Sequence, residues 1–240
     1  MQSKDAKPAP SPKGKRRGWV RETIEFLIST LVALIAFHWA VGEVRYIPSD
    51  SMSPLLKDGD HIFVEKVSGH LNRPIERGDV LVFYPPPRFM HRWQREDWLT
   101  KLADMTGLPF LPYEKALIKR VIGLPGEEVR VVRNVGIFIN GRLLDESAYS
   151  PEAPTYNLKY LSEIGGYNEN GQMVVPYPVR KSGRFKVIVP PGHYFMMGDN
   201  RNDSVDSHVW GFLNQIHIIG KASFVFWRPL GAPAYHQTDK

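Results

Sequence analysis

The chain has 240 residues, a net charge of +6 from 31 basic and 25 acidic side chains, and no cysteine. Seven of the basic groups and one acid fall in residues 1–21, so residues 22–240 hold 24 of each sign and no net charge. A nucleic-acid-binding face needs clustered cations, and a disulfide or thiolate site needs cysteine, so we expect no nucleic acid partner and neither cysteine feature. The eight histidines show no H-E-x-x-H or paired spacing, and we predict neither a metal nor a cofactor.

A long apolar run, IEFLISTLVALIAFHWAVG, covers residues 24–42. At about 1.5 Å per residue it nearly crosses the roughly 30 Å of a bilayer core. It is apolar on every side, unlike most core helices, and longer than the roughly 7–15 apolar residues of a cleavable signal peptide. Ala40 and Gly42 are spaced like a cleavage site, so cleavage stays an alternative. We predict a retained transmembrane helix at 23–42.

The charges around this run predict its direction. Basic residues lie between Lys13 and Arg21, whereas residues 42–50 hold one base and two acids. The positive-inside rule then places a disordered basic tail, residues 1–22, in the cytoplasm and everything after about residue 43 on the opposite side of the membrane. A single-pass protein of a bacterial cytoplasmic membrane fits this pattern best.

Beyond the span, short runs rich in Val, Ile and Phe alternate with turn residues, which predicts strands. This pattern is typical of a mainly β protein whose antiparallel sheets form a sandwich or a partly closed barrel. The predicted strands cover residues 61–67, 80–84, 116–123, 128–132, 136–141, 185–190, 193–198 and 221–227. We assign 43–141 and 185–235 to one β domain, followed by a short tail at 236–240.

Two stretches depart from the strand pattern. Residues 85–115 start with three prolines and then place Trp98, Leu99, Leu102 and Met105 on one helical face. That face could rest on the membrane surface or pack as a small helix on the sheet. Residues 142–184 are rich in Tyr, Pro, Asn and Gly, and we predict an insertion outside the core.

Three segments carry residues suited to nucleophilic catalysis. They are IPSDSMSPLL at 47–56, LIKRVIGLPGE at 117–127 and MMGDNRNDSVDSHVWG at 196–211. A serine hydroxyl needs an adjacent base, and a lysine serves if burial lowers its pKa. The apolar neighbours of Lys119 offer such a setting, although a strand lysine can equally point outward.

In content, order and spacing these segments resemble the conserved boxes of type I signal peptidases, a family of Ser-Lys serine proteases. The segment RGDVLVF at 77–83 matches a further box, and the preceding apolar run matches the family's membrane anchor. The resemblance implies a membrane-bound endopeptidase that removes signal peptides from exported preproteins after Ala-x-Ala-like sites. It also implies the lipid bilayer and the signal peptides of preproteins as partners, with the export machinery as a further candidate.

The same resemblance assigns roles to individual residues. Ser51, just before Met52, would be the nucleophile and Lys119 the general base. Ser49 would form the oxyanion hole with the Ser51 backbone N–H, and Ser204 would orient the lysine amine.

Other residues would support the site or bind substrate. Asp199, Arg201 and Asp206 match supporting residues that form ion pairs, with Arg120 as a candidate partner. Shallow pockets for small substrate side chains would be lined by Ile47, Pro48, Met52, Leu56 and Ile118.

Some positions depart from the family pattern. Asp50 stands where glycine is common, Glu127 replaces a common Asp, Asn202-Asp203 reverses a frequent order, and His208 replaces a usual arginine. A Ser-His-Asp hydrolase using His208 is one rival, although no G-x-S-x-G elbow occurs in the chain. A catalytically silent, membrane-tethered β domain that binds peptides or partner proteins is the other.

Overall fold

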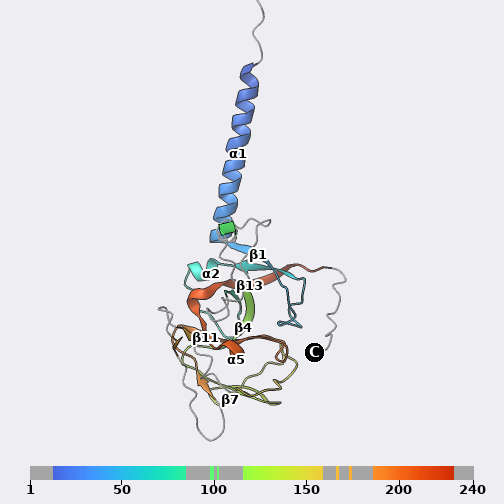
Figure 1. The fold of residues 1–240 in the computed structure, drawn as a ribbon, viewed down its shortest axis with the longest axis vertical. Coiled ribbons are helices and arrows are strands. Elements are labelled where there is room, and N and C mark those ends of the chain that lie inside the picture. The colour runs from blue at the N-terminus through green and yellow to red at the C-terminus, as the bar shows by residue number, and fades with distance from the viewer. Residues whose placement is uncertain are drawn as a thin grey trace, which may run out of the picture.

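A single long helix stands outside a β-rich body in the computed structural model of this chain (Figure 1). The structure describes residues 13–84, 98–99, 102, 116–158, 166–167, 173–174 and 186–229. The residues between 85 and 115, apart from three positions, lie outside the described part, and so does the prediction made for that stretch.

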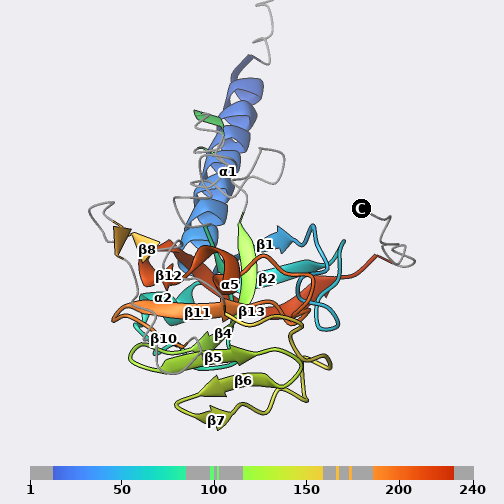
Figure 2. The same cartoon turned by 60° about the horizontal axis from the view of Figure 1, so that its bottom comes forward.

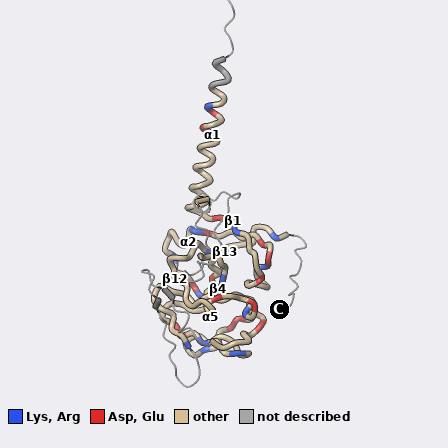
Figure 3. Tube along the Cα trace, viewed as in Figure 1, with Lys and Arg blue, Asp and Glu red and all other residues tan. Residues whose placement is uncertain are grey.

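Helix α1 spans Lys13–Ala40, and its Gly18–Ala40 portion is long and apolar enough to cross a membrane. Its side chains are largely exposed and almost uncharged over most of its length (Figure 3); Phe26, for example, is 67% exposed. A core helix would bury such residues, so the core-helix alternative is wrong. The helix begins at Lys13, so residues 13–22 of the tail predicted as disordered are helical. It ends two residues earlier than predicted because Gly42 begins the first strand.

The larger sheet has seven antiparallel strands in the order β1-β2-β13-β3-β4-β11-β12. In that order the strands are Gly42–Tyr46, His61–Glu65, Ile218–Trp227, Val80–Phe83, Leu117–Gly123, His193–Met197 and Leu213–Asn214. Short helices α2 (Val67–His70) and α5 (Ser207–Trp210) and a 3-10 turn at Gln215–His217 connect them.

A second, four-stranded antiparallel sheet packs below the first (Figure 2). Its order is β10-β5-β6-β7, with bounds Val187–Ile188, Glu128–Val132, Gly136–Ile139 and Arg142–Leu143. A separate pair, β8 (Gly166–Tyr167) and β9 (Met173–Val174), completes the described strands. The prediction of a mainly β, antiparallel fold is confirmed, and every strand-like run predicted above forms a strand.

Three apolar clusters hold the body together. The largest lies between the two sheets and includes Ile122 and Phe195 from the larger sheet and Val129 from the smaller. A second cluster packs the loop after β1 onto β2, β3 and β4. A third packs α5, through Trp210, against β3 and β11. The second cluster matters for the site because it seats the serine-rich loop.

The predicted insertion at 142–184 begins within the fold. Arg142–Leu143 form the edge strand β7, and Leu158 is 3% exposed in the core between the sheets. The Ser150 hydroxyl donates to the backbone carbonyl of Asp199 at 2.9 Å. The predicted boundary therefore lies too early, because residues 142–158 pack on the core and on the polar loop 198–206.

Candidate active site

Ser51 and Lys119 meet in a buried site between the loop at 47–60 and strand β4. Lys119 Nζ donates a hydrogen bond to Ser51 Oγ at 2.5 Å. Ser51 is 8% exposed and Lys119 is 3% exposed. The alternative that this strand lysine points to solvent is therefore wrong. A serine oxygen in contact with a buried amine is the arrangement that a Ser-Lys nucleophile requires.

Burial changes the acid–base properties of this lysine. It lowers the pKa of Lys119 to about 8, while the Asp206 and Asp199 carboxylates oppose the fall by stabilising the charged amine. With that pKa, about one Lys119 in ten is neutral at pH 7, against roughly one in several thousand for an ordinary lysine. The amine can therefore accept a proton under near-neutral conditions.

The exposed residue Ser49 lies beside the nucleophile, with its Oγ 3.3 Å from Ser51 Oγ. Its hydroxyl is in reach of an oxyanion that forms at a carbonyl attacked by Ser51. Ser204 Oγ is buried without a hydrogen-bond partner among the residues that the structure describes. Its role in orienting the Lys119 amine stays a prediction.

Gly198 explains how closely the polar loop approaches Ser51. A Cβ atom at this position would lie 2.3 Å from Ser204 Oγ and 2.4 Å from the Ser51 carbonyl oxygen. Any side chain would push the two loops apart, so only glycine fits this approach. The next contact is a hydrogen bond from the Asn200 backbone N–H to the Ser51 carbonyl at 3.2 Å.

A buried ion pair fixes the polar loop on strand β4. Arg120 Nε and Nη2 donate to the two carboxylate oxygens of Asp199 at 2.7 and 2.6 Å. Arg120 Nη1 donates to the Gly78 carbonyl at 2.7 Å, which ties the pair to the RGDVLVF segment. Removing one member of a buried pair typically costs about 3–5 kcal/mol. Arg120 directly follows Lys119 on β4. Its ion pair with Asp199 therefore holds the polar loop against the strand that carries the proposed base.

Arg201 is also buried, and its partners come from the segment predicted as an insertion. Its guanidinium donates to the Gly198 carbonyl and to the Glu146 carboxylate, and it lies 5.8 Å from the Tyr149 ring. The Arg120 guanidinium lies 4.2 Å above the same ring. Tyr149 thus lies close to both arginines that support the site.

Asp206 has no exposed surface and joins the polar loop to helix α5. Its Oδ2 accepts from the Gly198 N–H at 2.9 Å, and its Oδ1 lies 2.7 Å from His208 Nδ1. The His208 ring stacks on Tyr156 with centroids 4.2 Å apart. These contacts place His208 behind Asp206, whereas the amine that contacts Ser51 is that of Lys119.

The residues predicted to line substrate pockets divide into two groups. Pro48 is exposed beside Ser49 and could contact a peptide. Met52 has no exposed surface in this structure and packs in the cluster beneath the loop, and its contact with substrate stays a prediction. The others, which are buried with 3–6% exposure in the same cluster, are Ile47, Leu56 and Ile118. Their contact with substrate stays a prediction.

Several supporting residues carry no sequence signal of their own. Glu146, Tyr149 and Ser150 lie in the polar segment after β7, where no motif marks them. The Oδ1 atom of Asp50, which stands where glycine is common in the family, accepts from the Asp58 N–H at 3.0 Å. Its carboxylate therefore stabilises the nucleophile loop from within.

Comparison with known proteins identifies the family of this chain. The family described as signal peptidase, peptidase S26, matches residues 20–227. The chain belongs to this family. It is therefore a serine endopeptidase of the S26 type.

Relatives match most of the chain. A probable signal peptidase I-1 from Synechocystis sp. is 38% identical over 94% of this chain and 92% of that protein. Signal peptidase I from Leptolyngbya laminosa is 34% identical, covering 94% and 88%. Signal peptidase IB from Staphylococcus aureus is 30% identical, covering 86% and 91%. A crystal structure of a signal peptidase I from Enterococcus faecalis matches at 27% identity and a TM-score of 0.34, covering 63% of this chain and 98% of that one.

His208 provides a test between two kinds of serine protease. We expect His208→Gln to lower kcat/KM by less than about tenfold, because glutamine keeps a donor toward Asp206 and no proton passes through position 208. If His208 were the base of a triad, the same change would reduce kcat by about 10⁴-fold or more. Steady-state cleavage kinetics of the purified variant decide between the two.

Proposed function

We propose that this signal peptidase family member removes signal peptides from exported preproteins through a Ser51–Lys119 dyad. The 2.5 Å contact between Lys119 Nζ and Ser51 Oγ, in a site that excludes water from the amine, carries the proposal. Relatives that match most of the chain are named signal peptidases I, which supports signal peptides of preproteins as the substrate class.

The dyad would work by acyl transfer. Neutral Lys119 takes the Ser51 hydroxyl proton as Oγ attacks the scissile carbonyl carbon. The Ser49 hydroxyl and the Ser51 N–H stabilise the oxyanion, and the Lys119 ammonium returns the proton to the leaving amine. After the mature protein leaves, Lys119 takes a proton from the water that attacks the acyl carbon. Lys119 then returns this proton to Ser51 Oγ as the C–Oγ bond breaks and the signal peptide is released. Removing one oxyanion donor typically costs about 10²–10³ in kcat.

Part of strand β4 beside Ser51 is paired on one side alone among the described strands, which suits it to bind an extended substrate. Strand β11 pairs with β4 only through Arg120, Val121 and Gly123. Residues Leu117–Lys119 of β4 pair with β3 on one side, and no described strand pairs with them on the other side. A peptide could add to this free edge as a further strand, with small Ala-x-Ala side chains accommodated beside the buried cluster.

The contacts at the end of α1 favour a retained membrane anchor over a cleaved signal. His38 Nε2 lies 3.1 Å and Lys66 Nζ 2.7 Å from Glu43 Oε2. Burial acts to raise the pKa of Glu43, but the charges of Arg45 and Lys66 hold that pKa below its ordinary value. Glu43 thus joins the last turn of α1 to β1 and β2, which bear the Ser51 loop.

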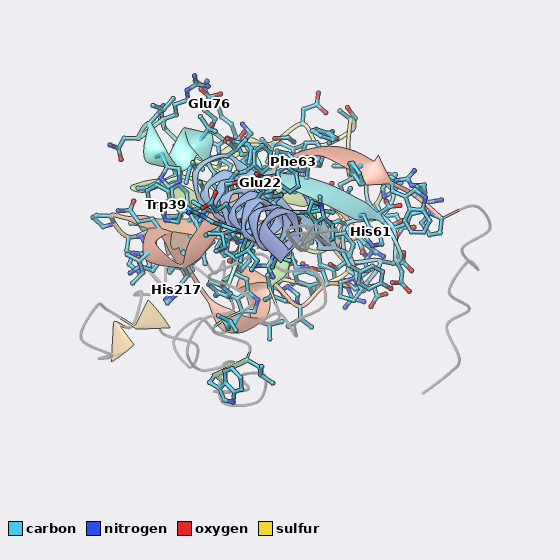
Figure 4. The ribbon with its side chains drawn as sticks, turned by 90° about the horizontal axis from the view of Figure 1, so that it is seen from above. Glu22, Trp39, His61, Phe63, Glu76 and His217 are labelled. Atoms are coloured by element: carbon cyan, nitrogen blue, oxygen red, sulfur yellow. The ribbon has the colours of Figure 1, made fainter. Side chains whose placement is uncertain are left out.

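Exposed aromatic side chains gather on the same end of the body and support a bilayer as partner. Tyr46, Phe224, Phe226 and Trp227 are each more than half exposed, on strands β1 and β13. Figure 4 views the molecule from the α1 side, with Trp39, His61 and Phe63 labelled. Such residues suit the membrane–water interface. With the basic tail cytoplasmic, Ser51 would work at the outer surface of the cytoplasmic membrane.

Cleavage of a defined preprotein tests the proposal. In detergent, the full chain should cut a preprotein after the second alanine of an Ala-x-Ala site, located by the mass of the mature product. A preprotein with leucine in place of that alanine is the matched control, and it should be cut at least about tenfold more slowly, since overfilling a close pocket costs about 1–3 kcal/mol. Equal cutting of both would contradict the assigned specificity, and no cutting of either would favour a silent binding domain.

The pH dependence tests the base. Because only neutral Lys119 accepts a proton, kcat/KM should rise about tenfold per pH unit below the lysine pKa of about 8 and level off above it. The profile is measured at fixed ionic strength with the enzyme's unfolding checked at each pH. An optimum on the acid side would contradict a lysine base.

A further inference from the structure

The loop that carries Ser51 is tied at its far end to strand β13 by an ion pair. Asp60 closes the loop and has no exposed surface. Arg228 Nε donates to Asp60 Oδ1 and Arg228 Nη2 donates to Asp60 Oδ2, both at 2.6 Å. A two-point contact of this kind fixes the direction of a carboxylate as well as its position.

The strand register explains why these two residues meet. His61 pairs with Tyr46 on β1 and with Trp227 on β13, and both strand pairs are antiparallel. The residue before His61 therefore lies opposite the residue after Trp227. Asp60 and Arg228 thus face each other at the same end of three adjacent strands.

Asp60 also organises the loop itself. Its Oδ2 accepts from the Lys57 backbone N–H at 3.0 Å, and its backbone carbonyl accepts from the Ile47 N–H at 2.8 Å. Arg228 Nη2 donates in addition to the Leu55 carbonyl at 3.4 Å. Asp60 therefore joins the two ends of the loop at 47–60 through its backbone carbonyl, while its carboxylate and Arg228 hold the second half of the loop.

We propose that Arg228 and Asp60 are positioning residues for peptide cleavage, holding the loop so that Ser51 Oγ meets Lys119 Nζ. This proposal rests on the assignment of Ser51 as nucleophile above. The opposite side of the loop is held by Asn200, whose N–H donates to the Ser51 carbonyl. Without the ion pair the loop keeps that support, its internal hydrogen bonds and the apolar cluster beneath it, but loses its anchor on β13. A displacement of about 1 Å at a reacting group can cost about 10²-fold in rate.

The exposure of the two partners separates this pair from an ordinary surface salt bridge. The Arg228 side chain is 48% exposed, but the Asp60 side chain is fully buried. Exposed pairs contribute little, whereas a carboxylate that is shielded from water and held at two points by its partner contributes more. Lys221 on the same strand pairs with Asp79 and has a similarly exposed side chain, at 42%, so it offers a matched control.

Cleavage kinetics of the full chain in detergent test the proposal with Arg228→Ala, Arg228→Lys and Lys221→Ala. For Arg228→Ala we expect kcat to fall about 10- to 100-fold with KM within about threefold and the rise with pH at the same position, because Lys119 and strand β4 are untouched. Arg228→Lys should recover part of the loss, since an ammonium keeps the charge but not the fork. Lys221→Ala should stay within about twofold of wild type.

Wild-type kcat in folded Arg228→Ala, or an equal loss in Lys221→Ala, would overturn the positioning role. If Arg228→Ala fails to fold, Arg228→Lys decides: a native melting temperature with unchanged kcat would overturn it. Ser51→Ala keeps the two proposals apart. Cleavage by Ser51→Ala would contradict the assignment of Ser51 as nucleophile. An inactive Ser51→Ala together with a fully active Arg228→Ala would contradict the positioning role alone.

Discussion

Ser51→Ala should lower kcat for preprotein cleavage by about 10⁴-fold or more, the size of loss seen when a serine protease loses its nucleophile. The variant keeps Ser49, the backbone N–H groups and the loop, so binding of the preprotein should persist with KM little changed. The measurement is single-turnover cleavage at enzyme excess, which detects very slow product formation, alongside a binding assay for the uncut preprotein.

A neighbouring serine provides the control for this change. Ser53 lies in the same loop, and its backbone N–H donates to the Asp50 carbonyl at 2.9 Å, a contact that alanine retains. Ser53→Ala should therefore cleave within about threefold of wild type, as expected for a substitution outside the site. If both variants cleave equally well, the nucleophile lies elsewhere.

Lys119→Met should abolish cleavage to a similar degree while leaving the protein at least as stable. Methionine fills much the same volume as lysine but cannot accept a proton from Ser51. The wild-type amine is desolvated, and burial that lowers its pKa to about 8 is unfavourable for the charged form. Replacing it by an apolar side chain removes that cost, so the melting temperature should not fall. Loss of activity without loss of stability marks a functional residue.

Two further variants separate a base from a mere cation at this position. Lys119→Arg keeps a positive charge that stays protonated at any usable pH, so it should be as inactive as Lys119→Met. Lys186→Met removes a lysine that pairs with Glu128 far along the chain from the nucleophile and should leave kcat nearly unchanged. Substantial activity in Lys119→Arg would mean that the amine contributes charge and not proton transfer.

Strand positions could be predicted well because their side chains alternate between water and an apolar cluster. In β2 the buried residues Ile62 and Val64 alternate with partly exposed neighbours, which is the pattern that the sequence shows. Strand β1 escaped prediction because its buried positions include Glu43 and Arg45. These charges are buried as a pair, so the strand has none of the apolar periodicity on which strand prediction depends.

Supporting contacts of the site were harder to predict than its chemistry. The serine, lysine and polar segments resemble, in content and order, the boxes of a Ser-Lys protease family, and that resemblance indicated the chemistry. Glu146 and Tyr149 could not be found this way, because an acid and an aromatic residue in a polar segment fit any surface loop. Only packing shows that this segment covers Arg120 and Arg201.

The sequence was sufficient for properties that depend on residue type and local spacing: an apolar helix long enough to span a bilayer, an antiparallel β body and a set of residues able to act as nucleophile and base. Tertiary structure alone decided whether Lys119 is exposed or buried, and therefore whether its pKa suits proton transfer. It also decided which acids and bases pair, since Ser51 and Lys119 lie 68 positions apart and Arg120 and Asp199 lie 79 apart. The physical reason is that burial and pairing depend on strand register and on the packing of loops over the sheet, which join residues distant in the chain.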